Sequence, residues 1–183
     1  MRIISGNLKG RRLNPPNNLP VRPTTDMAKE GLFNILNNYV DYENCDVMDL
    51  FAGTGSISFE FISRGVKTLT SVDINAQCID FIKTTAMRLN VPNIHVVRAD
   101  VFDFLKRAYK KFDIIFADPP YAIDNLVQLP DIVFDKGLLN PDGIFILEHP
   151  NDYNFEEHKY FWQHRAYGKV NFTFFAMEMG ETQ

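Results

Sequence analysis

The tetrapeptide Asp118-Pro119-Pro120-Tyr121 follows an apolar run at 114–117 and combines one acid, two prolines and one aromatic ring. Each proline holds its φ angle at about −65° and lacks an N–H donor, so the turn is rigid and rich in carbonyl acceptors. A carboxylate and a proline carbonyl beside the N–H groups of a planar amine can turn its lone pair toward an electrophile. The Tyr121 ring can stack on a planar group. The pattern favours chemistry on a planar amine; the alternative is a rigid structural turn.

The segment DLFAGTGS, at 49–56, joins an acid to a Gly-x-Gly turn. Gly53 and Gly55 permit a tight turn and close backbone approach, and the helix predicted after them supplies free N–H groups. A dinucleotide-binding fingerprint needs a third glycine where this chain has Ser58. Asp49 can attract an ammonium group, which an adenosyl ligand with an amino acid tail carries. These features favour S-adenosylmethionine over NAD, although such turns also occur without a ligand.

Asp73 ends a predicted strand 24 residues after Asp49, close to the roughly 20-residue offset at which an acid meets ribose hydroxyls. Asp100 ends the next strand and can accept a hydrogen bond from an adenine amino group, with Val101 or Phe102 packed on the ring. Each acid can also cap the helix that follows it. Four carboxylates thus end successive predicted strands: Asp49, Asp73, Asp100 and Asp118. In a parallel sheet these ends meet at one edge, where ligands bind.

Short apolar runs alternate with helical patterns over most of the chain, which is typical of a parallel sheet covered on both faces. The predicted strands are at 46–51, 67–73, 93–100, 112–117 and 143–149. The first predicted helix follows Thr24 or Thr25, either of which can cap it. The other predicted helices are at 57–65, 76–89, 101–109 and 126–134. Two more strands, joined near Gly168, are too close for a crossover helix and must be antiparallel.

These elements predict an α/β protein with a Rossmann-like, mainly parallel seven-stranded sheet and a C-terminal antiparallel hairpin, the class I methyltransferase arrangement. The pieces RIIS and RRL near the N-terminus predict a short β-hairpin extension. A segment rich in proline and asparagine, at 14–23, follows it. We therefore expect two units: a basic N-terminal extension at 1–23 and a methyltransferase domain at 24–183.

The net charge of −4 argues against nucleic-acid binding. Residues 1–29, however, contain six Lys or Arg and a single Asp, so this piece either faces RNA or is a solvated basic edge.

Cys45 and Cys78 have neither disulfide nor zinc spacing, and reduced cysteines suit the cytoplasm. No apolar run approaches the ~18 residues of a membrane span, and the N-terminus lacks a signal-peptide pattern.

The tetrapeptide resembles the Asp/Asn-Pro-Pro-Tyr signature of methyltransferases that act on amino groups of adenine, cytosine, guanine or glutamine. Five segments along nearly the whole chain also resemble the RsmD family: MRIISGNLKGRRL, RPTTDMAKEGLFNIL, MDLFAGTGSISFEFISRG, DIIFADPPY and YGKVNFTFFAME. That family methylates N2 of a guanine in bacterial 16S ribosomal RNA, named as guanine 966. The resemblance implies S-adenosylmethionine as cofactor, 16S RNA or the small ribosomal subunit as partner, and no metal. A monomer is the default expectation.

The resemblance also implies roles for individual residues. Those implied in catalysis are Asp118, Pro119, Pro120 and Tyr121. Those implied in cofactor binding are Asp49, Phe51, Gly53, Gly55, Asp73, Ile74, Asp100 and Val101. Those implied in RNA contact are Arg11, Arg12, Arg22 and Thr24. Glu148 and His149, at the end of the fifth predicted strand, either border the substrate or are structural.

Two other functions stay open at this point. A DNA adenine N6 or a protein glutamine presents the same planar amine, so the tetrapeptide does not separate these acceptors from guanine. A non-catalytic ribosome-assembly factor would bind RNA and keep only the cofactor fold. The intact Asp118 and the Gly53-x-Gly55 turn argue against this last alternative.

Overall fold

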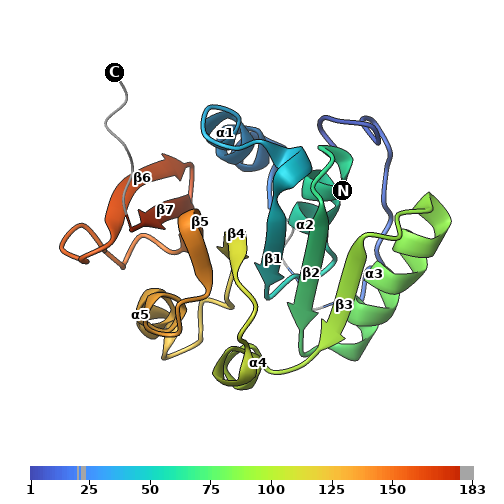
Figure 1. Cartoon of the computed structure of the whole chain (residues 1–183). Helices are drawn as coiled ribbons and strands as arrows, with labels where there is room; N and C mark the ends of the chain where they lie inside the picture. The colour runs from blue at the N-terminus through green and yellow to red at the C-terminus, as the bar shows by residue number, and fades with distance from the viewer. Residues whose placement is uncertain (20, 22–23, 178–183) are drawn as a thin grey trace.

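The structure, a computed structural model, describes residues 1–19, 21 and 24–177. Seven strands form one sheet in the order β3-β2-β1-β4-β5-β7-β6 (Figure 1). The strands are β1 (Asp46–Leu50), β2 (Thr68–Asp73), β3 (Ile94–Arg98), β4 (Phe112–Ala117), β5 (Leu139–His149), β6 (Phe161–Tyr167) and β7 (Val170–Ala176). β7 runs antiparallel to both β5 and β6, and the other neighbours are parallel. The predicted mainly parallel sheet with a C-terminal antiparallel hairpin is confirmed.

Helices cover both faces of the sheet (Figure 1). One face carries α1 (Asp26–Leu36), α2 (Ser56–Ser63) and α3 (Ala76–Leu89), and the other carries α4 (Val101–Arg107) and α5 (Leu129–Asp135). Because strand side chains alternate, Ile114 and Phe116 pack toward α1 and α2, whereas Ile115 packs toward α4 and α5. Two short 3₁₀ helices are also present, at Tyr42–Asn44 and Leu126–Gln128. The second occupies the first three residues of the helix predicted at 126–134, so the α-helix begins at Leu129. Among the described residues, no helix is long and apolar enough to cross a membrane.

The N-terminal extension forms the predicted hairpin over a short stretch only. The Ile3 N–H donates to the Arg11 carbonyl at 3.0 Å, and the Leu13 N–H donates to the Met1 carbonyl at 2.9 Å. Arg2 and Arg12 form one isolated antiparallel bridge, and no strand is assigned in residues 1–19. Ile3 and Leu13 of this segment are buried against apolar side chains of α2 and α3. Beyond this short pairing the segment is held by packing on the domain, because the backbone N–H groups of Ile4 and Ser5 donate to a side chain of α2.

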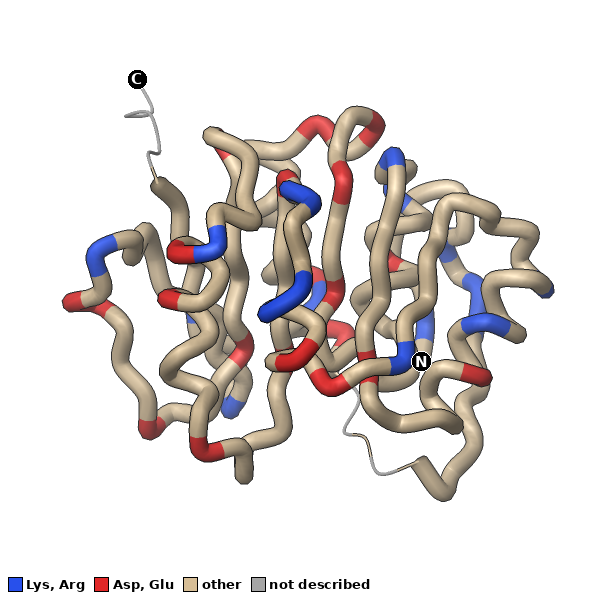
Figure 2. Tube along the Cα trace, turned by 60° about the horizontal axis from the view of Figure 1, so that its bottom comes forward, with Lys and Arg blue, Asp and Glu red and all other residues tan. Residues whose placement is uncertain are grey.

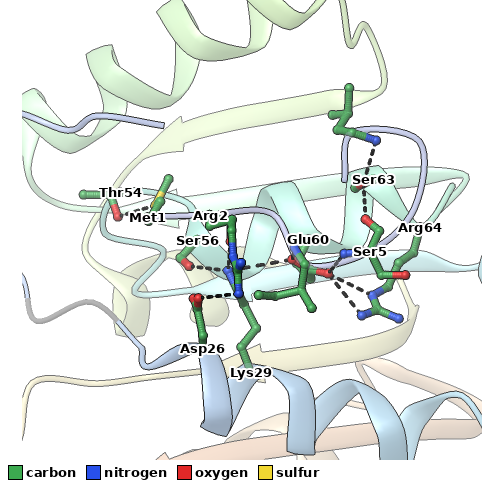
Figure 3. A network of polar contacts seen from close by, with 12 residues as sticks. Met1, Arg2, Ser5, Asp26, Lys29, Thr54, Ser56, Glu60, Ser63 and Arg64 are labelled. Atoms are coloured by element: carbon green, nitrogen blue, oxygen red, sulfur yellow. Dashed lines mark hydrogen bonds and ion pairs between the residues drawn. The ribbon is translucent and has the colours of Figure 1, made fainter. Parts of the chain in front are cut away.

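That side chain belongs to Glu60, which is fully buried and holds the segment in place (Figure 3). Its Oε2 accepts from the Ile4 N–H at 2.9 Å, and its Oε1 accepts from the Ser5 N–H at 3.0 Å. Lys29 Nζ of α1 lies 3.7 Å from Glu60 Oε2 and donates to the Arg2 carbonyl at 2.6 Å. Burial lowers the pKa of Lys29, and the charge of Glu60 opposes this shift. The network therefore ties the extension to both α1 and α2.

Gly6 marks the point where the extension crosses the end of α2. Its φ is +81°, and a Cβ placed there would lie 1.8 Å from the Ser63 carbonyl oxygen. The neighbouring Asn7 N–H donates to that oxygen at 2.7 Å. Only glycine combines this backbone conformation with so close an approach, so the sequence itself specifies the docking.

Candidate active site

A cavity of about 560 Å³ opens beside the carboxyl ends of β1 and β4. The strand order changes direction between these two strands, which is where ligands bind in open α/β sheets. The volume falls within the range of small-molecule sites. All four strand-end acids line this cavity: Asp49, Asp73, Asp100 and Asp118. The structure thus brings together the carboxylates that the sequence placed at one edge.

Most of the other predicted site residues line the same cavity: Thr24, Phe51, Gly53, Ile74, Val101, Pro119, Pro120 and Tyr121. Gly55 is not among the lining residues. It precedes α2 with a φ of 78°, and a Cβ there would lie 3.0 Å from Ile82 Cγ1, so it shapes the turn. Arg11 and Arg12 are exposed on the extension, away from the cavity lining. Arg22 lies outside the described residues.

Asp49 is buried beneath α2 and is held by hydroxyl groups. It faces Ser71 across the β1–β2 pair, and Ser58 Oγ of α2 donates to Asp49 Oδ2 at 2.5 Å. Ser71 Oγ lies 2.7 Å from Ser58 Oγ, whose own hydrogen is engaged, so Ser71 donates. Burial raises the pKa of Asp49 to about 7; the Ser58 hydrogen bond opposes this shift, and the charge of Asp73 adds to it. Ser58, which the sequence marked only as a missing glycine, orients the acid.

This raised pKa gives an expected pH dependence of stability. The folded state holds the Asp49 proton up to about pH 7, whereas an ordinary aspartate loses it near 3.8. Between these two pH values the folded chain binds one proton more at Asp49 than the unfolded chain does. The contribution of Asp49 to the free energy of unfolding therefore falls as the pH rises, by up to ~1.4 kcal/mol per pH unit. We expect urea unfolding between about pH 4.5 and about pH 6.5 to show this component in the native chain and not in Asp49→Asn. Parallel pH profiles for the two proteins would contradict the assignment.

Asp73 and Asp100 each make local hydrogen bonds as well as lining the cavity. Asp73 Oδ2 accepts from the Gly53 N–H and Oδ1 from the Asn75 N–H, both at 2.8 Å. The N-cap of α3 is Asn75 itself, so Asp73 instead ties the glycine turn to the end of β2. Asp100 does cap α4, through a 3.0 Å bond from the Asp103 N–H. Capping and cavity lining coexist at Asp100, as the sequence allowed.

The tetrapeptide lines the cavity where β4 ends beside β1. The Asp118 N–H donates to the Leu50 carbonyl at 3.3 Å, so the pairing of β4 with β1 extends as far as the acid. A bond from the Ile123 N–H to the Pro120 carbonyl, at 3.0 Å, closes the following turn. Tyr121 is 40% exposed and lines the cavity. A sheet strand therefore fixes the acid, and a stiff turn carries the ring.

Glu148 and His149 have different surroundings although they are adjacent in sequence. Glu148 is buried and lines the cavity, on the wall formed with Asp118. His149 Nδ1 donates to the Pro150 carbonyl at 2.9 Å, and its Nε2 accepts from the Thr173 hydroxyl at 2.7 Å. Burial lowers the pKa of His149, which agrees with this neutral arrangement. Glu148 thus lines the candidate site, whereas the contacts of His149 are structural. Among the described residues no cluster of metal-ligating side chains occurs.

Comparisons with known proteins agree with this architecture. The family described as Conserved hypothetical protein 95, which is the RsmD family, has a model that matches residues 1–176. The chain belongs to the RsmD family. This RsmD-family chain is 34% identical to "Ribosomal RNA small subunit methyltransferase D" of Buchnera aphidicola over 84% of its own length and 78% of that protein. It is 35% identical to "Putative rRNA methyltransferase YlbH" of Bacillus subtilis, with 86% of each chain covered.

A solved structure extends the similarity to three dimensions. "Putative methyltransferase yhhF from Escherichia coli" superposes on the RsmD-family chain with a TM-score of 0.83 and 26% identity, over 96% of each chain. The class I methyltransferase fold expected from the alternation of strands and helices is therefore confirmed.

Proposed function

We propose that this protein transfers the methyl group of S-adenosylmethionine to N2 of a guanine in 16S ribosomal RNA, at the position the family names as guanine 966. The observation that carries the proposal is the single cavity that joins three strand-end acids to the Asp118–Tyr121 turn. The names of the relatives support ribosomal RNA as the substrate class.

The acids around the glycine turn fit the donor groups of S-adenosylmethionine. Asp49, which lines the cavity and accepts from Ser58 of α2, would attract the ammonium group of the amino acid tail. Asp73, at the end of β2, would accept from the ribose hydroxyls, and Asp100 from the adenine amino group. Phe51, Ile74 and Val101 would supply apolar contacts for the ring. When bound, this cofactor supplies a methyl group on a positively charged sulfur.

The residues on the other wall would prepare the attacking amine. A guanine flipped out of its helix would stack on Tyr121, with the Asp118 carboxylate and the Pro119 carbonyl accepting from its two amine hydrogens. These bonds would turn the nitrogen lone pair toward the methyl carbon that the cofactor supplies, where an N–C bond would form as the S–C bond breaks. The nitrogen gains positive charge in this step, which Asp118 stabilises, and it then releases a proton.

The docked extension would contact the RNA backbone beside the cavity. Thr54 of the glycine turn donates to Met1 Sδ at 3.4 Å, so the extension and the cofactor loop are in contact. Figure 2 turns the molecule so that the ends of β1 to β3 come forward, and it shows Lys and Arg interspersed with Asp and Glu. Because the basic groups are scattered, a small number of exposed residues such as Arg11 and Arg12 would make the phosphate contacts. The RNA contacts of Arg22 and Thr24 stay predictions.

Replacing these two arginines is expected to weaken RNA binding without changing the cofactor site. For Arg11→Gln/Arg12→Gln we expect RNA affinity to fall about tenfold, and the salt dependence of binding to drop by about one unit of slope per lost phosphate contact. Filter binding at several salt concentrations measures both quantities. Arg88→Gln, exposed near the far end of α3, is the matched control and should change neither. Equal effects from the two variants would rule out the extension as an RNA contact.

Transfer of tritium from labelled cofactor tests the proposed function. The purified chain is incubated with small ribosomal subunits, free ribosomal RNA, DNA and a cell protein extract from which ribosomes have been removed. We expect label in RNA only, and its nucleoside digest should contain N2-methylguanosine. Label in DNA or protein alone would establish one of the rival acceptors, and no label in any of them would favour the non-catalytic assembly factor.

A further inference from the structure

The geometry points to Glu148 as the residue that selects guanine over other planar amines, by accepting a hydrogen bond from the ring N1–H beside the reactive amine. This inference rests on the proposed function and adds a specificity residue to it. It starts from the position of Glu148 in the sheet. Ala117 of β4 pairs with Leu147 of the parallel strand β5. Asp118 and Glu148 each follow one of these paired residues, so they lie side by side at the ends of neighbouring strands.

The two acids also share one face of the sheet. Side chains alternate along each strand; Phe116 and Ile146, two residues before these acids, both pack in the core beneath α1 and α2. Asp118 and Glu148 continue that face at the edge of the sheet, and both line the cavity. Neighbouring strands are about 4.8 Å apart, so one planar base can meet both carboxylates along a single edge.

The chemistry of the acceptor decides which base fits. In adenine, cytosine and glutamine, the polar atom beside the amine-bearing carbon is an acceptor: a ring nitrogen or the amide oxygen. Guanine alone offers an N–H donor there, at N1, next to the N2 amine. An ionised carboxylate can only accept hydrogen bonds, so it would face another acceptor if adenine, cytosine or glutamine were bound. Glu148 is just 5% exposed, so water could not bridge the two acceptors and offset the cost of leaving them unpaired. The buried acid would therefore favour guanine and disfavour the other three.

This arrangement also supplies what the tetrapeptide lacks. Asp118 and the Pro119 carbonyl can accept from any planar amine, so they promote attack without identifying the acceptor. Glu148 identifies the acceptor from the adjacent strand by its contact with a second atom. Catalysis and selection are thus assigned to different strands of the same wall, and they can be separated by substitution.

The test compares Glu148→Gln with the native chain on two substrates. Both are small-subunit particles, with either guanine or 2-aminopurine at the target position; 2-aminopurine keeps the N2 amine but has an acceptor at N1. We expect the native chain to prefer guanine by at least about 100-fold in kcat/KM. In Glu148→Gln, whose amide can donate to N1, we expect the guanine value to fall about 10- to 100-fold while the 2-aminopurine value stays within about threefold or rises.

Controls separate this inference from a structural effect and from the proposed function. Cofactor affinity and the thermal unfolding midpoint should be unchanged in Glu148→Gln, and Glu157→Gln, an exposed acid, should behave as the native chain. An equal loss on both substrates, or no change on either, would overturn the role of Glu148 while native activity on guanine still supports the proposed function. No native activity on guanine, with label reaching another acceptor, would overturn both.

Discussion

Asp118→Ala is expected to abolish most methyl transfer while cofactor binding stays intact. The carboxylate is assigned to an amine hydrogen and to the charge that develops on the nitrogen, and loss of one such preorganised group costs about 100- to 1,000-fold in kcat. The acids that would bind the cofactor lie on β1, β2 and the start of α4, and they are unchanged in this variant. We therefore expect cofactor affinity, measured by calorimetry, to change by no more than about threefold.

Two comparison variants sharpen this test. Asp118→Asn keeps an acceptor oxygen at the same place, so its activity should lie between those of the native chain and Asp118→Ala. Asp124→Ala removes an exposed acid from the same loop and should be as active as the native chain. Native turnover in Asp118→Ala would refute the role of this carboxylate, and a matching loss of cofactor affinity would move the role to binding.

Glu60→Gln is expected to destabilise the protein by about 3–5 kcal/mol, because it leaves a buried cation without its partner. Lys29 and Glu60 are both almost fully buried, and Arg64 also pairs with Glu60 Oε1 at 3.1 Å. The same carboxylate accepts from Ile4 and Ser5 of the extension. Equilibrium unfolding in urea measures the loss, and hydrogen exchange at residues 1–13 should quicken before the rest of the chain opens.

A double variant distinguishes loss of the charge pair from other effects of the substitution. Adding Lys29→Met to Glu60→Gln removes the unpaired cation and should recover part of the lost stability. Glu43→Gln, at an exposed acid, should change stability little. Two outcomes would contradict the role of the buried network in holding the extension. One is a free energy of unfolding for Glu60→Gln equal to that of the native chain. The other is a loss of stability in the double variant equal to the sum of the losses in the two single variants.

The alternation of strand and helix patterns predicted the sheet because each strand end carries a local signal. Asp49, Asp73, Asp100 and Asp118 are all found at the predicted edge, since parallel strands bring their carboxyl ends together whatever their order. The placement of Glu148 beside Asp118 depends on that order. Nothing in the spacing of residues places β5 beside β4, so the sequence left Glu148 undecided.

The hairpin predicted for the extension is present, but it is shorter than the segments RIIS and RRL indicate. Residues 1–3 pair with 11–13, whereas the backbone N–H groups at 4, 5 and 8 donate to Glu60 and Ser63 of α2. One signal of this was present in the sequence. Glu60 lies within SISFEFIS, where apolar residues surround it on all sides of the helix, and a helix of that kind is buried. An acid there needs buried donors, which the extension supplies.

The most direct test of the central claim is to map N2-methylguanosine in the 16S ribosomal RNA of cells that lack this protein. The proposed function predicts that one such modification, at the position named as guanine 966, disappears on deletion. It should return with the native gene but not with the gene for Asp118→Ala. Unchanged modification at this position in the deleted strain would contradict the assignment of guanine in 16S RNA as the substrate.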